Sequence, residues 1–213
     1  MNQQRAARSA AGSSALATRD LPSIHQPARG SAEFLRGFLR NPAQVGSVTP
    51  SSQRLEQRLV RNAGIAQAQT VVELGPGTGG TTAAILRAMG PTARLLAIEL
   101  DPNFYRHLRT SMHDPRLALE QGSAEELDKL LEWHGMAAPD AIVSGIPFST
   151  MPPEVSDRIA AAIAGVLRPG GRFVAYQVRA HVAGFVSPFL GTPAKEWEWV
   201  NMPPVRVFRW VKA

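Results

Sequence analysis

The sequence has no cysteine, which excludes disulfide bonds and metal sites built from thiolates. Its five histidines are scattered and show no spacing typical of metal ligands, such as HExxH. We therefore expect no metal centre. The lack of cysteine also favours a protein of the cytoplasm over one of an oxidising compartment.

Long hydrophobic runs are absent as well. The run at 159–167 is far shorter than the roughly 20 residues that cross a bilayer, and the first residues are too polar for a secretory signal. No membrane span is predicted. With 213 residues, 44% of them hydrophobic, the chain is long enough for a single α/β domain with a substantial core.

Acidic residues are scarce at the start of the chain. Residues 1–61 contain nine arginines and three acidic residues, whereas the charges of residues 62–213 balance. Such a basic segment is typical of an arm that binds a polyanion, either a nucleic acid or an anionic membrane surface. We expect residues 1–30, which show no apolar periodicity, to form a disordered basic tail.

Residues 31–40 predict a short basic amphipathic helix. Four apolar side chains would fall within an arc of about 140°, with two arginines opposite: Phe34, Leu35, Phe38, Leu39, Arg36 and Arg40. A helix of this kind can pack on its own domain, insert into a headgroup layer or bind another protein.

From residue 70 onward, apolar strand-like runs alternate with helical stretches. The expected strands are 70–74, 94–100, 116–121, 140–145 and 172–178. This alternation predicts an α/β, Rossmann-like fold with a mostly parallel sheet. The end of the chain predicts an antiparallel edge hairpin, in which we expect Trp197, Trp199 and Trp210 to pack.

Polar and glycine residues gather where the first two expected strands end. The first runs into "ELGPGTGG", with Glu73, Gly75, Gly77 and Gly79 in the pattern E-x-G-x-G-x-G, and the second ends at Glu99. Glycines allow close approach of the backbone to a ligand, and a carboxylate at the second strand can accept both hydroxyls of a ribose. A cofactor containing adenosine is therefore predicted.

These motifs resemble those of the class I S-adenosylmethionine-dependent methyltransferases over residues 70–211. The resemblance implies that S-adenosylmethionine is the cofactor and that the glycine loop holds its methionine and ribose portion. The residues that it assigns to the cofactor are Glu73, Gly75, Gly77, Gly79, Glu99, Leu100, Ser123, Ala124, Ser144, Gly145 and Ile146.

The stretch "SGIPFST", 144–150, follows the fourth expected strand. Enzymes of this fold that methylate planar amines carry an Asn/Asp-Pro-Pro-Tyr or Asn-Ile-Pro-Tyr signature here, which grips an amino group and stacks an aromatic ring on the base. This chain keeps Ile146, Pro147 and Phe148 but has Ser144 and Gly145 in place of the amide. The loss of the amide weakens a nucleobase interpretation, and an aliphatic amine needs less.

Residues 41–52, "NPAQVGSVTPSS", resemble a segment of the bacterial, peripherally bound phosphatidylethanolamine N-methyltransferases. That family in turn resembles the ribosomal RNA adenine dimethyltransferases, which add a helical domain for which we expect no room here. The resemblance implies methyl transfer to phosphatidylethanolamine, successively towards phosphatidylcholine, by a cytoplasmic enzyme at the inner face of the cell membrane. The alternatives are an RNA or DNA adenine methyltransferase and, more remotely, a non-catalytic cofactor-binding module.

In the lipid interpretation the 31–40 helix would contact the membrane, and no protein partner is inferred. The domain organisation would be a basic tail over 1–30, a membrane- and substrate-facing segment over 31–69 and a methyltransferase core over 70–213.

The amine must be neutral to attack the methyl group, and we expect Tyr176 and His181 to position or deprotonate it. Arg179 is available for a phosphate diester, and Phe148 and Tyr176 are the expected aromatic faces for a methylated cation.

Overall fold

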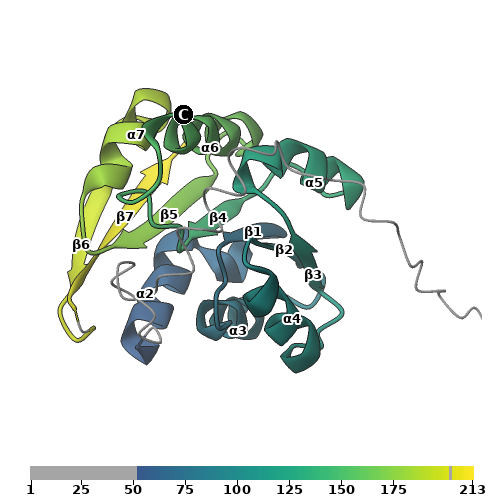
Figure 1. Cartoon of the computed structure of the whole chain (residues 1–213). Helices are drawn as coiled ribbons and strands as arrows, with labels where there is room; N and C mark the ends of the chain where they lie inside the picture. Colours follow the sequence, from purple (N-terminus) through teal and green to yellow (C-terminus); the bar gives the residue numbers. More distant parts are fainter. Residues whose placement is uncertain (1–51, 202) are drawn as a thin grey trace, which may run out of the picture.

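The computed structural model describes residues 52–201 and 203–213. The predicted 1–30 tail and 31–40 helix lie outside these residues, as does nearly all of the 41–52 segment. Within the described residues, helices pack against both faces of one twisted sheet (Figure 1). None of these helices has the length and apolar character that a bilayer crossing requires.

The described strands form a seven-stranded sheet in the order β3-β2-β1-β4-β5-β7-β6. They are β1 Thr70–Leu74, β2 Arg94–Glu99, β3 Leu117–Gln121, β4 Ala141–Ser144, β5 Arg172–Gln177, β6 Ala194–Glu198 and β7 Val205–Val211. The first five are parallel, and β7 is antiparallel to both β5 and β6. The predicted Rossmann-like sheet with an antiparallel edge hairpin is confirmed.

Two apolar cores lie on the two sides of this sheet. The helices are α2 Gln53–Ala63, α3 Gly80–Ala88, α4 Pro102–Ser111, α5 Leu127–Trp133, α6 Pro153–Val166 and α7 His181–Leu190, with short 3-10 turns η1 Ile65–Gln67 and η2 Ala124–Glu126. One core joins the sheet to α2 and α3, and the other joins it to α5, α6 and α7. Because both faces are covered, the central strands are continuous apolar runs without alternation.

Helix α2 shows why part of the N-terminal segment belongs to the core. It begins at Ser52, whose side chain accepts a hydrogen bond from the Leu55 amide at 3.2 Å, and it ends at Gly64 with φ of 68°. Leu55 and Leu59 are buried under the sheet. The described part of the predicted 31–69 segment is thus a packing element, while the proposed membrane-facing part lies outside the described residues.

The prediction that the three tryptophans pack in the hairpin is right for one of them. Trp210 is buried and stacks on Phe173, with ring centroids 5.3 Å apart. Trp197 and Trp199 are exposed instead, so the prediction is wrong for these two. They belong to the β6 side of the hairpin, and β6 is an edge strand with mostly exposed residues.

Candidate functional site

The loops at the carboxyl ends of β1, β2 and β4 are bonded to one another. The Gly75 amide donates to the Ile98 carbonyl at 2.9 Å, and the Gly145 amide donates to the Leu74 carbonyl at 2.9 Å. Strand order reverses between β1 and β4, the position at which open α/β sheets bind ligands. The predicted cofactor residues Glu73, Gly75, Gly77, Gly79, Glu99, Leu100, Ser123, Ala124, Ser144, Gly145 and Ile146 all belong to β1, β2 and β4 or to the segments that follow strands β1 to β4.

The glycine loop after β1 has the backbone that its sequence predicts. Gly75, Gly77 and Gly79 all have positive φ, at 72°, 57° and 88°, which side chains with a Cβ rarely adopt. Among the described atoms, none lies within 4 Å of the position that a Cβ on Gly77 would take. The next helix, α3, begins without a side-chain cap, so its first amides are free for an anionic group.

Glu99 holds this loop from the end of β2. Its carboxylate accepts the Gly77 amide at 2.9 Å and the Asp101 amide at 2.8 Å, one on each oxygen. Burial raises the pKa of Glu99, and these two backbone donors oppose that effect. Each carboxylate oxygen can still accept one further bond, so Glu99 fits two ribose hydroxyls as well as the loop. Within the described residues, Glu99 is thus the acidic side chain that is bonded to the glycine loop.

Glu73 is buried in β1, and its Oε2 is among the buried polar atoms that have no hydrogen-bond partner in the described structure. Burial raises the pKa of Glu73 to about 8; the Thr82 side chain acts in the opposite direction and the Glu99 carboxylate in the same one. An orphaned carboxyl beside an open glycine loop fits a cationic ligand group, such as the ammonium of a methionine moiety.

Ser123 and Ala124, which the resemblance assigns to the cofactor, lie after β3 beside the end of β2. Both are buried at the beginning of η2, just after β3. The Ser123 hydroxyl accepts the Glu125 amide at 3.2 Å, so this turn is fixed beside the end of β2. Binding of the cofactor by these residues stays a prediction.

The loop 144–150 after β4 is named the acceptor loop, because we expect it to face the amine that accepts the methyl group. Buried side chains of this loop set its conformation. Ser144 is fully buried, and its hydroxyl accepts the Ile146 amide at 3.2 Å. Phe148 is also buried and stacks on Phe185, with centroids 6.3 Å apart. The cation–π role expected of Phe148 is therefore wrong, because its ring faces the core and not the site. We expect Ser144 to shape the loop.

Gly145 occupies the position at which the Asn-Ile-Pro-Tyr signature carries its amide. A Cβ placed on Gly145 would lie 2.7 Å from the Tyr176 hydroxyl and 3.0 Å from the Gly75 carbonyl oxygen. The hydroxyl of Tyr176, from β5, thus fills the space that the signature gives to a side chain. The predicted candidate Tyr176 does reach the acceptor loop.

Gln177 is a site residue that the sequence reasoning missed. It is 8% exposed at the end of β5, and its Nε2 donates to the Ile146 carbonyl at 2.7 Å. Its Oε1 has no partner in the described structure. A polar residue within the apolar strand "RFVAYQ" was the available signal, because such a residue needs a specific buried partner.

His181 lies apart from Tyr176. It begins α7 and lines an open groove of about 620 Å³ together with Asp157, Ala180, Gly184 and Phe185. Tyr176 packs instead against the core that joins the sheet to α2 and α3. The structure therefore places His181 in this groove and does not pair it with Tyr176. Arg179 is exposed in the short connection before α7.

Residues 71–171 match a family model described as a methyltransferase domain. An ornithine lipid N-methyltransferase from Singulisphaera acidiphila is 33% identical over 141 residues, which cover 66% of this chain and 73% of that protein. A ribosomal RNA small subunit methyltransferase A from Nocardia farcinica is 29% identical over 160 residues, which cover 74% of this chain and 52% of that protein.

Among solved structures, TrmN from Thermus thermophilus matches 86% of this chain and 53% of its own, with a TM-score of 0.64 and 21% identity. This likeness establishes the fold alone. The family is shown by the relative of 33% identity and by the matched methyltransferase domain. The chain belongs to the class I methyltransferases, whose cofactor is S-adenosylmethionine.

Proposed function

We propose that the chain transfers methyl groups from S-adenosylmethionine to the amine of a membrane lipid, with phosphatidylethanolamine as the expected substrate and phosphatidylcholine as the end product. The cofactor, when bound, supplies an activated methyl group on a sulfonium. The protein then has to hold a neutral amine in line with that methyl group and exclude water. We propose the inner face of the cell membrane as its place of action.

The observation that carries this proposal concerns Gly145 and Tyr176. Gly145 lacks the amide side chain of the signature, and the Tyr176 hydroxyl lies in the space of that side chain. An amide reads a planar base edge with a donor and an acceptor in fixed directions. Here its place is taken by a phenol hydroxyl, which lies 2.7 Å from where the Gly145 Cβ would be. A rotating hydroxyl suits a single alkyl amine, which has no plane to recognise.

The charge state of the amine sets the chemical demand on the site. An alkylammonium has a pKa of roughly 10.4, so deprotonation at pH 7 costs on the order of 4 to 5 kcal/mol. The hydroxyl of Tyr176 at the acceptor loop and the imidazole of His181 in the groove are the groups that we propose as acceptors of the amine proton. Arg179 is proposed for the phosphate of the lipid.

The relative that is named an ornithine lipid N-methyltransferase supports a lipid amine, and it makes ornithine lipid a second substrate to test. The relative that is named a ribosomal RNA methyltransferase supports an RNA adenine as the second candidate function. The chain spans about half the length of that RNA relative.

Incubation of the purified protein with S-adenosylmethionine and each acceptor in turn tests the proposal. Mass spectrometry should detect mono-, di- and trimethylated products of phosphatidylethanolamine dispersed in detergent, and no methylated adenine in ribosomal RNA. Methylation of ornithine lipid alone would keep the lipid class and replace the substrate. Methylation of RNA alone would overturn the lipid proposal.

Tyr176→Phe is expected to lower kcat for lipid methylation by about 10- to 100-fold while leaving the Kd of S-adenosylmethionine within about twofold, because only the hydroxyl at the acceptor is lost. His181→Ala should act in the same way. His107→Ala, on the exposed side of α4, is the matched control. Unchanged kcat in both site variants would refute their roles.

A further inference from the structure

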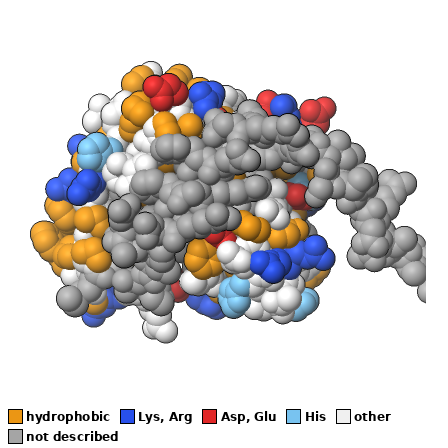
Figure 2. Space-filling model, in the orientation of Figure 1, with side chains coloured by type: hydrophobic (Ala, Val, Ile, Leu, Met, Phe, Trp, Pro, Cys, Tyr) orange, Lys and Arg blue, Asp and Glu red, His pale blue; other side chains and the backbone are white. Residues whose placement is uncertain are grey.

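Two exposed tryptophans form a stacked pair on the β6–β7 hairpin. Trp197 is 40% exposed and Trp199 is 67% exposed, and their rings are 4.7 Å apart with planes at 14°. The next residue, Val200, is 55% exposed. In Figure 2 hydrophobic side chains gather at the left edge, where Figure 1 draws this hairpin. An apolar surface of this kind marks a contact with a membrane or a partner.

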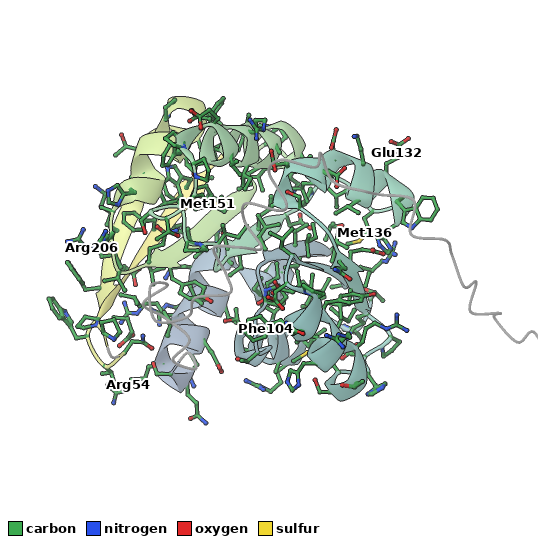
Figure 3. The ribbon with its side chains drawn as sticks, viewed as in Figure 1. Arg54, Phe104, Glu132, Met136, Met151 and Arg206 are labelled. Atoms are coloured by element: carbon green, nitrogen blue, oxygen red, sulfur yellow. The ribbon has the colours of Figure 1, made fainter. Side chains whose placement is uncertain are left out.

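Arginines lie on and beside the hairpin that carries the tryptophan pair. The Arg206 guanidinium lies 4.4 Å above the Trp197 ring. The two acidic residues of β6 are paired with arginines of α2: Arg58 lies 2.5 Å from Glu196 and 2.9 Å from Glu198, and Arg61 lies 3.8 Å from Glu196. A hollow of about 170 Å³ beside them is lined by Arg54, Gln57, Arg58, Arg61 and Glu198. Arg206 and Arg54 lie on the same side of the molecule in Figure 3.

The hairpin also stands at the edge of the sheet that carries the acceptor loop. Arg206 is in register with Gln177 of β5, and Gln177 bonds the Ile146 carbonyl of that loop. Trp197 is in register with Arg206. A flat surface that contacts the tryptophans would therefore also lie next to the acceptor loop.

The end of the hairpin is held in place, so the tryptophans sit on an ordered support. The Asn201 side chain is buried and accepts the Ser52 amide at 3.2 Å. The Val200 amide donates to the Glu198 carboxylate at 3.2 Å, and Arg58 of α2 bonds the same carboxylate. Ordered aromatic rings lose little conformational entropy when they bind.

We propose that the face formed by Trp197, Trp199, Val200 and Arg206, here named the hairpin face, docks on the headgroup layer of an anionic bilayer. Indole rings prefer the interface between water and hydrocarbon, and arginines bind anionic headgroups. The docked hairpin presents the acceptor loop to lipid amines in the headgroup layer. This inference rests on the proposed lipid function and adds a contact separate from the predicted 31–40 helix.

The test compares the full-length double variant Trp197→Ser, Trp199→Ser with Trp133→Ser. Trp133 is 55% exposed at the end of α5, next to Glu132, which Figure 3 places at the opposite end of the molecule from Arg206. Cosedimentation uses vesicles of phosphatidylcholine and phosphatidylethanolamine, with and without phosphatidylglycerol. The double variant should bind the anionic vesicles about tenfold more weakly and methylate phosphatidylethanolamine in them correspondingly more slowly, whereas Trp133→Ser should match the parent.

An assay on lipid dispersed in detergent distinguishes a failure of this inference from a failure of the proposed function. The double variant should methylate dispersed lipid within about twofold of the parent, because it keeps the acceptor loop. If the parent methylates no lipid in detergent, the proposed function fails. If the parent is active and the double variant binds vesicles equally well, the hairpin inference fails. If light scattering shows a dimer for the parent and a monomer for the double variant, with unchanged vesicle binding, the hairpin face belongs to a contact with a second copy.

Discussion

Replacing Glu99 with alanine should weaken the binding of S-adenosylmethionine by about 30- to 1000-fold. Two ribose hydroxyls lose their buried acceptor, a loss of about 2 to 4 kcal/mol. The glycine loop also loses a hydrogen bond, since the same carboxylate accepts the Gly77 amide at 2.9 Å. Titration calorimetry on the purified variant measures the change in Kd.

Glu99→Gln is the matched variant, because it keeps the size of the side chain and one acceptor oxygen. It should bind the cofactor with an intermediate Kd. Thermal unfolding without ligand establishes whether each variant is folded. A folded Glu99→Ala protein with the Kd of the parent would remove Glu99 from the cofactor site and leave it only as a support of the loop.

The parent should lose stability as the pH rises from 5 to 8. Glu73→Gln should remove the part of that loss that comes from the ionisation of Glu73. Burial raises the pKa of Glu73 in the folded protein to about 8, well above the range of an exposed glutamate. The folded protein therefore binds more protons than the unfolded chain between these values, and its free energy of unfolding falls as pH rises through this window. The fall is on the order of 3 kcal/mol.

Denaturant unfolding at pH 5, 6.5 and 8 measures this effect. At pH 5 the variant and the parent should agree within about 1 kcal/mol, because a neutral carboxyl and an amide have similar needs. At pH 8 the variant should be the more stable of the two. Carboxyls with lowered pKa, such as Asp114 at about 2 beside Arg116, titrate below this window. Parallel pH profiles would show that Glu73 is ionised in the folded protein.

Much of the fold follows from local sequence. The strand β1 has the predicted bounds, and the other four parallel strands differ by only a residue at one or both ends. These elements are readable because a strand buried on both faces must be continuously apolar, and because positive φ at Gly75, Gly77 and Gly79 restricts the turn to glycine. The same motifs identified the cofactor class.

The division of roles among the site residues was not readable in this way. Sequence spacing puts Glu73 and Glu99 at the ends of neighbouring strands, but only the folded loop shows that Glu99 takes the Gly77 amide while Glu73 keeps an orphaned oxygen. Gln177 and its bond to Ile146 join residues 31 positions apart. Hydrogen bonds between distant residues depend on the register of the strands, which no local pattern encodes.

The sequence by itself determined the α/β class and the cofactor, since these depend on periodicity and on residue types with special backbone properties. Tertiary structure decided which aromatic rings face water. Phe148 is buried and Trp199 is 67% exposed, although both follow strand-like runs in the sequence. Exposure depends on what covers each strand, and only the packing of helices against the sheet settles that.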